Sequence, residues 1–226
     1  MKFEAGDDID SNHCIVLVHE FFRCEESFKE FALLGETMIT QGRNRELSCK
    51  TYNAYARFIH HLYEFMLGCI AREVKNTDVN GFMKDCIREA KKVKDVKIDH
   101  TKLLDNYVHS HTQRILNKRR ASIIEGTAPC WENHISYYPE SVPHDFAPEF
   151  RKYRNKIIGH VAYERSSKLS LTEFYNKYHK YLGLIYHEGK YWRIRGSEFP
   201  DLNEITEFSL MIQSEGTEYD RTTDKL

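Results

Sequence analysis

Apolar residues recur every three or four positions along most of the chain, the spacing that places them on one face of an α-helix. We expect six helices, over residues 11–40, 49–75, 82–93, 99–124, 144–165 and 171–187. The first begins at Ser11 or Asn12, both good N-cap residues, with a break expected at residues 24–27. The alternation over residues 190–195 allows a short C-terminal strand. The predicted fold class is all-α, a bundle of four to five long helices with short additions.

The helix expected over residues 49–75 has the clearest pattern. Its apolar stripe consists of Tyr52, Tyr55, Ile59, Leu62, Met66 and Ile70. The opposite stripe, at about 100° per residue, carries Arg57, His60, His61, Glu64 and Gly68. These residues either line a cleft or form a surface face on which Glu64 pairs with one of the two histidines.

The only long connection is expected over residues 126–145, where four glycine or proline residues interrupt four aromatic or histidine residues. Connections of this length are uncommon in compact domains unless they have a function. Its aromatic side chains either stack on a base or act as a staple over the apolar end of the bundle. We favour the staple.

The net charge of −1 conceals a segregation of charge along the chain. Residues 1–40 carry three basic and nine acidic residues, and residues 197–226 carry two and eight. In contrast, residues 84–120 carry eleven basic and five acidic residues, and residues 151–168 carry six and one. The middle of the chain therefore forms either a local positive surface or an ordinary solvated helix face.

We expect a flexible acidic N-terminus over residues 1–10, a single helical domain over 11–196, and an acidic C-terminal segment over 197–226 with a disordered end. No stretch reaches the roughly 18 consecutive apolar residues of a membrane-spanning helix. The first residues lack the pattern of a signal peptide. The six cysteines are scattered, which is typical of reduced thiols. A cytoplasmic protein that does not bind a membrane is the prediction.

The candidate chemistry lies in the segment from Arg151 to His160, within which Arg154, Asn155 and His160 stand close together. Arginine holds a phosphate through two parallel, charge-assisted hydrogen bonds. Histidine transfers protons because its unperturbed pKa of about 6.5 lies near physiological pH. These residues suffice to cleave a phosphodiester without a metal ion or cofactor.

This segment resembles the signature of the HEPN superfamily (higher eukaryotes and prokaryotes nucleotide-binding), an arginine, a polar residue, and a histidine after four to six residues. The resemblance implies a HEPN-like helical bundle and a ribonuclease in which 2′-hydroxyl attack leaves a 2′,3′-cyclic phosphate and a 5′-hydroxyl. It also implies a role in anti-phage or toxin–antitoxin defence, with an antitoxin or activator protein as partner. Some toxin subfamilies carry a tyrosine two residues after the histidine, where this chain has Ala162, with Tyr163 one position later.

By this resemblance Arg154 holds the phosphate, His160 transfers protons, and Asn155 orients the histidine or donates to the phosphate. Further substrate contacts are expected from Lys156, Arg151, Arg57, His61 and Glu64. The RNA, whether tRNA or mRNA, is not specified by the residues.

An ideal helix places Arg154 and His160 about 120° apart, so their side chains do not converge on a straight helix. Either a distortion near Gly159 rotates the histidine, or two copies of the helix meet across a two-fold axis. The HEPN resemblance implies the second solution, a homodimer with a composite active site, because the chain contains one motif.

Two other interpretations remain open. One is a metal enzyme using His60, His61 and Glu64, or His109 and His111, although neither spacing is typical of a catalytic metal site. The other is a non-catalytic module that binds a nucleotide, RNA or a protein. Arg154 and His160 buried and hydrogen-bonded within one subunit, with no groove beside them, would favour that module.

Overall fold

The computed structural model describes residues 1–93, 97–159, 163, 168–194, 202, 204–205 and 207–213. Over these residues the chain is all-α, as predicted, and no strand is formed. The elements in chain order are α1 (Asp8–Gln41), α2 (Arg45–Glu73), α3 (Val79–Val93), α4 (His100–Ile124), a 3-10 turn (Ile135–Tyr137), α5 (Phe146–Arg154), a π-helical turn (Asn155–Gly159) and α6 (Leu171–Ile194).

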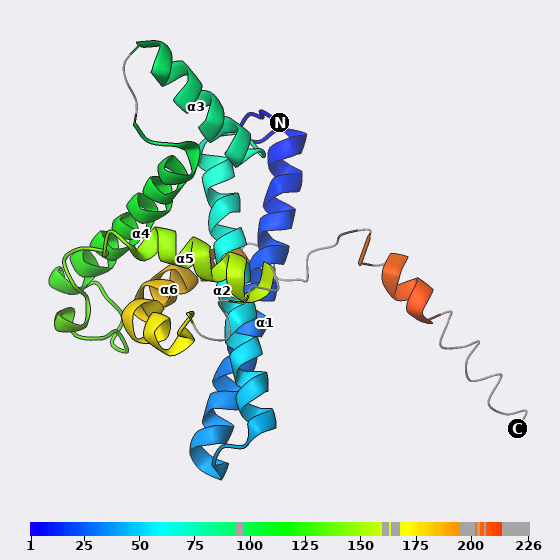
Figure 1. Cartoon of the computed structure of the whole chain (residues 1–226), viewed down its shortest axis with the longest axis vertical. Helices are drawn as coiled ribbons and strands as arrows, with labels where there is room; N and C mark the ends of the chain where they lie inside the picture. The colour runs from blue at the N-terminus through cyan, green and yellow to red at the C-terminus, as the bar shows by residue number, and fades with distance from the viewer. Residues whose placement is uncertain are drawn as a thin grey trace, which may run out of the picture.

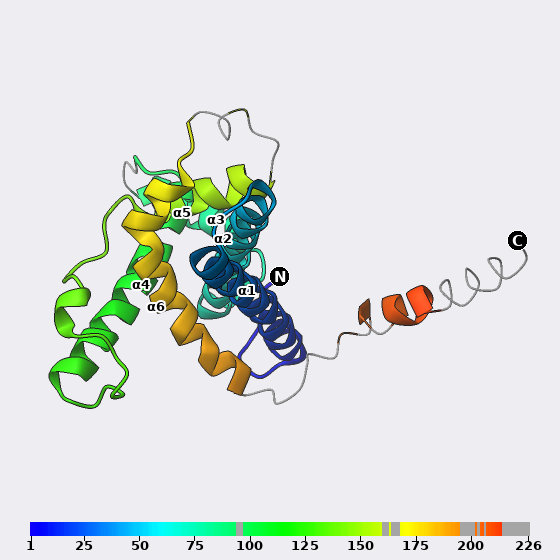
Figure 2. The same cartoon turned by 90° about the horizontal axis from the view of Figure 1, so that it is seen from below.

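Helices α1 and α2 form a long antiparallel hairpin, and α3, α4, α5 and α6 lie along its middle and upper part in the view of Figure 1. The short helix α5 crosses α2 and also contacts α4 (Figure 1). Seen from below, α6 runs diagonally beside α1 and α4 (Figure 2). Helix α2 is therefore the central element, since α1, α4, α5 and α6 all contact it.

The apolar stripe predicted on α2 lies in the core, with Tyr52 alone half-buried. The opposite stripe is half-buried, because α1 packs on part of it while Glu64 pairs with Arg154 at the end of α5. Arg57 pairs with Glu30 of α1, and His61 Nδ1 lies 2.7 Å from Glu20 Oε1.

The core is rich in aromatic side chains, and one of them packs directly against a glycine of α6. The buried phenyl rings include Phe21, Phe58, Phe146, Phe150 and Phe174. A Cβ added to Gly189 of α6 would lie 2.3 Å from Phe21 Cε2 of α1. Only a glycine allows the two helices to approach this closely.

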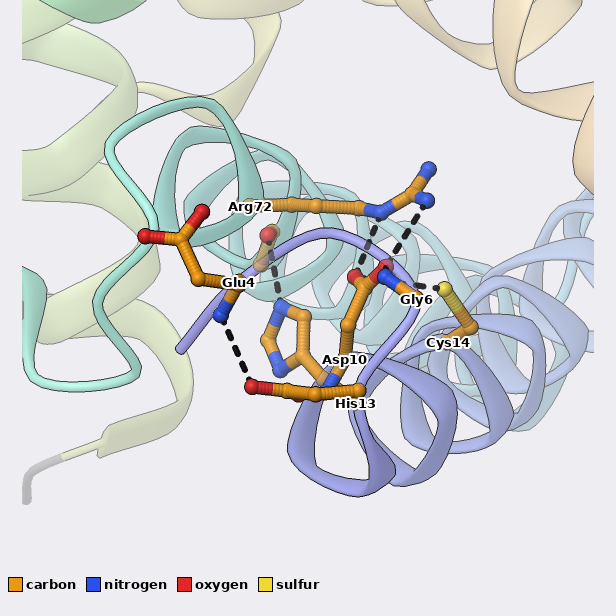
Figure 3. A network of polar contacts seen from close by, with 8 residues as sticks. Glu4, Gly6, Asp10, His13, Cys14 and Arg72 are labelled. Atoms are coloured by element: carbon orange, nitrogen blue, oxygen red, sulfur yellow. Dashed lines mark hydrogen bonds and ion pairs between the residues drawn. The ribbon is translucent and has the colours of Figure 1, made fainter. Parts of the chain in front are cut away.

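The first ten residues are anchored to the end of α2, which corrects our expectation of a flexible N-terminus. Phe3 is buried, and its N–H donates to the carbonyl of Lys75 at 3.2 Å. Buried Asp10 accepts from Arg72 through Nε at 2.8 Å and Nη2 at 3.2 Å, and from the Gly6 N–H at 2.9 Å (Figure 3). The Arg72 guanidinium and these hydrogen bonds lower the pKa of Asp10 to about 2.

Several predicted boundaries were wrong. Helix α1 begins three residues before Ser11, because the Asp7 side chain caps it by accepting from the Asp10 N–H at 2.7 Å. It has no break at residues 24–27, where Cys24, Glu25 and Ser27 are buried.

The predicted strand at residues 190–195 was also wrong over its described part, because α6 continues to Ile194. This stretch is helical, and Trp192 packs against the core. The helix predicted over residues 144–165 is α5, which ends its α-helical part at Arg154.

The connection over residues 126–145 acts as a staple in one part only. Tyr138 and Val142 are buried, and the Val142 N–H donates to Gln113 Oε1 of α4 at 2.8 Å. Trp131 and Tyr137 are instead exposed.

All six cysteines are free thiols. No helix among the described residues is long and apolar enough to cross a membrane.

Candidate functional site

Helix α5 presents Arg154 at the point where the α-helical geometry ends. Pro148 lies in its first turn, where a missing N–H is tolerated. Phe150 and Tyr153 are buried, as is Ile157 in the next turn, so this edge of the helix packs into the core. From Asn155 to Gly159 the chain forms a π-helical turn. Such turns are rare and are found often at functional sites.

Arg154 is held by two side chains, one from α2 and one from its own segment. Its Nε donates to Glu64 Oε1 at 2.6 Å, and its Nη2 pairs with the same carboxylate. Its Nη1 donates to Asn155 Oδ1 at 2.7 Å. Arg154 and Glu64 are separated by 90 positions in the chain. The guanidinium is therefore oriented before any ligand arrives.

This arrangement leaves part of the guanidinium available. The Arg154 side chain is 30% exposed and that of Glu64 29%. Of the five N–H donors of a guanidinium, the contacts with Glu64 and Asn155 use one on each nitrogen, so these contacts leave two. Charge-assisted donors of this kind hold a phosphate oxygen, although the Glu64 carboxylate offsets the positive charge.

Three neighbouring residues of α2 form a patch beside this arginine. His60, Tyr63 and Glu64 lie three and four positions apart and therefore share a helix face. The Arg154 guanidinium carbon lies 5.8 Å from the centre of the Tyr63 ring. The Tyr63 hydroxyl and His60 Nδ1 are buried, and neither has a hydrogen-bond partner among the described residues. Burial lowers the pKa of His60, and the charges of His61 and Arg154 act in the same direction.

His61 is oriented away from this patch, toward α1. It pairs with Glu20, as described above. Burial alone would raise the pKa of Glu20, but the hydrogen bond and charge of His61, together with Arg23, lower it overall. His61 thus contributes to the α1–α2 contact and not to the surroundings of Arg154.

The other predicted substrate-binding residues are dispersed. Arg151 forms a bidentate pair with the nearly buried Asp105 of α4, at 2.8 and 3.0 Å, which raises the pKa of Arg151. Arg57 pairs with α1. Lys156 lies in the π-helical turn with a half-buried side chain. The proposed proton donor, His160, lies outside the described residues.

The histidine pairs considered as metal ligands point apart. His109 stacks on His144 and places Nε2 3.0 Å from the Val142 carbonyl, whereas His111 Nδ1 lies 3.8 Å from Glu73 Oε2. Within the described part of the chain, no three His, Cys, Asp or Glu side chains are close enough together to hold a metal ion.

The structure thus brings together Arg154, Asn155 and Glu64 with His60, which had been considered only as a cleft or metal-binding residue, and adds Tyr63, which was not among the candidate residues. The sequence contained one usable signal for Tyr63, its position three residues after His60 and directly before Glu64. It had been masked by the apolar stripe of the same helix, which includes two other tyrosines.

Comparison of the chain with protein-family models, with curated proteins and with solved structures finds no match. The function must therefore be argued from the site.

Proposed function

We propose that this chain is a metal-independent endoribonuclease whose site is formed by Arg154, Asn155 and His160. One observation supports the proposal above all. The Arg154 guanidinium is fixed by a carboxylate and an amide, yet remains partly exposed, six residues before a histidine and at the start of a π-helical turn. A preorganised donor of this kind stabilises charge that develops on a phosphate in the transition state.

In the proposed reaction the ribose 2′-oxygen attacks the adjacent phosphorus while the bond from phosphorus to the 5′-oxygen breaks. The products are a 2′,3′-cyclic phosphate and a 5′-hydroxyl. The 2′-hydroxyl loses its proton and the leaving oxygen gains one, and His160 exchanges protons with one of these two groups. Arg154 binds the non-bridging oxygens through its two remaining N–H donors.

Glu64 serves as a positioning residue in this scheme. It accepts from Arg154 on the side away from Asn155, so it fixes the plane of the guanidinium. Its negative charge also weakens the attraction of the pair for a free anion. The site then favours a phosphate that is held by further contacts over inorganic phosphate in solution.

We further propose that the active form is a homodimer with a composite site, because the chain contains one such motif. Ile158 of the π-helical turn is 38% exposed, which places apolar surface next to Arg154 where a second copy would meet it. A role in anti-phage or toxin–antitoxin defence, with an antitoxin or activator as regulator, belongs to the same proposal.

A second candidate is a non-catalytic module that binds RNA, a nucleotide or a protein through the same surface. The pairing of Arg154 with Glu64 within one chain favours it, since the carboxylate already balances the charge of the arginine without a substrate. The two candidates differ in whether RNA is cleaved.

The test is to incubate wild type, Arg154→Ala and His160→Ala with total RNA and tRNA in EDTA, and to analyse the fragment ends. Lys152→Ala serves as the matched control, because Lys152 lies on the same helix and pairs with the neighbouring Glu149 at 2.9 Å. We expect wild type and the control to cleave and to leave cyclic phosphates, while the other two variants do not.

Equal cleavage by all four proteins would identify a contaminant or another site and refute the proposal. Binding of RNA by wild type without cleavage, weakened by Arg154→Ala, would support the non-catalytic module instead.

A further inference from the structure

A second surface, distant from Arg154, combines exposed aromatic rings with basic side chains. It is a cleft of about 620 Å³ between the C-terminal half of α4, residues 127–131 and the end of α6. We call it the α4–α6 cleft. Its lining includes Trp131, Tyr191, Lys118, Arg119, Lys190 and Glu188.

The two aromatic side chains of the α4–α6 cleft remain largely in water. Trp131 is 68% exposed and Tyr191 is 59% exposed. Burying exposed aromatic rings of this size against a partner is energetically favourable. Trp131 follows Pro129, which restricts the backbone that carries it. Both rings are therefore available to stack on a planar partner.

The charged residues that line the cleft carry a net positive charge. Three of the lining side chains are basic and one, Glu188, is acidic. Lys118 Nζ lies 2.7 Å from Glu188 Oε1 and 5.5 Å from the centre of the Tyr191 ring. Arg119 is fixed by Glu132, whose side chain is only 5% exposed. Lys190 lies 5.1 Å from the buried ring of Tyr186, at the edge of the cleft.

We propose that the α4–α6 cleft binds single-stranded RNA, with bases stacked on Trp131 and Tyr191 and the phosphates near Lys118 and Lys190. That the strand is RNA rests on the proposed function. That the ligand has stacking bases and phosphates follows from the aromatic and basic side chains of the cleft. Aromatic rings beside basic groups are the combination by which proteins hold single strands. A duplex keeps its bases paired and stacked, so it fits this cleft less well.

The cleft is separate from the Arg154 site. Helix α4 links the two regions, because Asp105 holds Arg151 of α5 and Lys118 follows 13 residues later. That separation corresponds to about 20 Å along the helix. The α4–α6 cleft therefore contributes to binding of the strand and not to the bond-breaking step.

The test measures binding without cleavage. A labelled 2′-O-methyl oligonucleotide of roughly 12 nucleotides has no attacking hydroxyl and covers a typical single-strand site. The variants are Trp131→Ala, Trp131→Phe, and Lys118→Ala combined with Lys190→Ala. Lys50→Ala is the matched control, an exposed lysine paired with Glu46 on the distant α1–α2 hairpin.

We expect Trp131→Ala to raise the dissociation constant about tenfold and Trp131→Phe to raise it less, since stacking is retained. The double lysine variant should reduce the slope of log affinity against log salt by about two. In a Trp192→Phe background, Trp131 is the single remaining tryptophan, and the strand should quench its fluorescence whereas a duplex should not.

Wild-type affinity in the Trp131→Ala and double lysine variants would overturn the proposal, as would equal quenching by a duplex or no binding by wild type. Thermal unfolding of each variant shows whether a loss of binding comes from misfolding, and Trp131→Phe provides a less disruptive second measurement. If wild type cleaves RNA but the cleft variants bind the oligonucleotide as tightly as wild type, only the proposed role of the cleft is refuted. If the oligonucleotide binds at the cleft but wild type does not cleave RNA, only the proposed ribonuclease activity is refuted.

Discussion

Replacing Tyr63 with phenylalanine should stabilise the protein. The Tyr63 hydroxyl is buried and has no hydrogen-bond partner among the described residues. A buried, unsatisfied polar group costs about 1–3 kcal/mol. The ring itself packs edge-on against Phe150, at 5.0 Å between centres and 90° between planes, and phenylalanine preserves that contact. We therefore expect Tyr63→Phe to raise the free energy of unfolding by about 1 kcal/mol.

A gain of that size corresponds to a rise of about 2–4 °C in the melting temperature of a chain of this length. Denaturant unfolding measures it as a shift in midpoint at constant slope. The matched control is Tyr153→Phe, because the Tyr153 hydroxyl donates to the Ser170 carbonyl at 2.9 Å. Losing that bond should destabilise the protein by about 1 kcal/mol. The two identical chemical changes thus have opposite expected signs.

A loss of stability in Tyr63→Phe comparable to that of the control would refute the reasoning, since it would mean that the hydroxyl has a partner. RNA cleavage by the same variant gives a further result. Increased stability together with reduced cleavage would indicate that the chain keeps this hydroxyl for its reaction, at a cost in stability.

Three further outcomes are expected. Gly189→Ala should destabilise the protein by about 1–3 kcal/mol, because the added methyl group would meet a buried phenyl ring. The methyl group of Gly183→Ala, on the same helix, would meet nothing within 4 Å, so this variant should be neutral or more stable by up to about 1 kcal/mol. Equal effects of the two variants in thermal unfolding would contradict this. Burial lowers the pKa of His179 from 6.5 to about 4, so the unfolded chain binds the proton more tightly than the folded chain. The free energy of unfolding should therefore fall by up to roughly 3 kcal/mol as the pH drops from about 6.5 to about 4. His179→Asn should flatten that pH dependence of stability, and an unchanged pH profile would refute the assignment. Mixing inactive Arg154→Ala and His160→Ala proteins should restore part of the wild-type cleavage, because about half of randomly formed dimers are mixed and each mixed dimer brings one intact Arg154 and one intact His160 to the shared site. No restoration would argue for a site within one chain.

The helices could be predicted because their pattern is local. The apolar stripe of α2 recurs at three- and four-residue steps whatever packs against it, and most of it is buried. The end of α6 was mispredicted because Tyr191 and Trp192 are also typical of strands. Trp192 packs against the core formed with the other helices, and this contact is not contained in the local pattern.

The candidate site was predictable in part for a similar reason. Arg154 and Asn155 are adjacent in sequence, so their association could be inferred. The identity of their acidic partner could not, because Glu64 is 90 positions away and an acidic residue on that stripe of α2 had nearer histidines with which to pair. Arg151 shows the converse, since its charge suggested a phosphate contact but Asp105 already binds it.

The π-helical turn after Arg154 has a consequence for how this protein tolerates insertions and deletions. A π-helical hydrogen bond spans one residue more than an α-helical one. Removing a single residue from Asn155–Gly159 would therefore allow regular α-helix through this turn and would rotate the later residues of the turn by about 100° around its axis. A substitution in the turn leaves that register unchanged. One-residue insertions and deletions in the turn, more than substitutions, would therefore change the direction in which the side chains after Arg154 in this turn point.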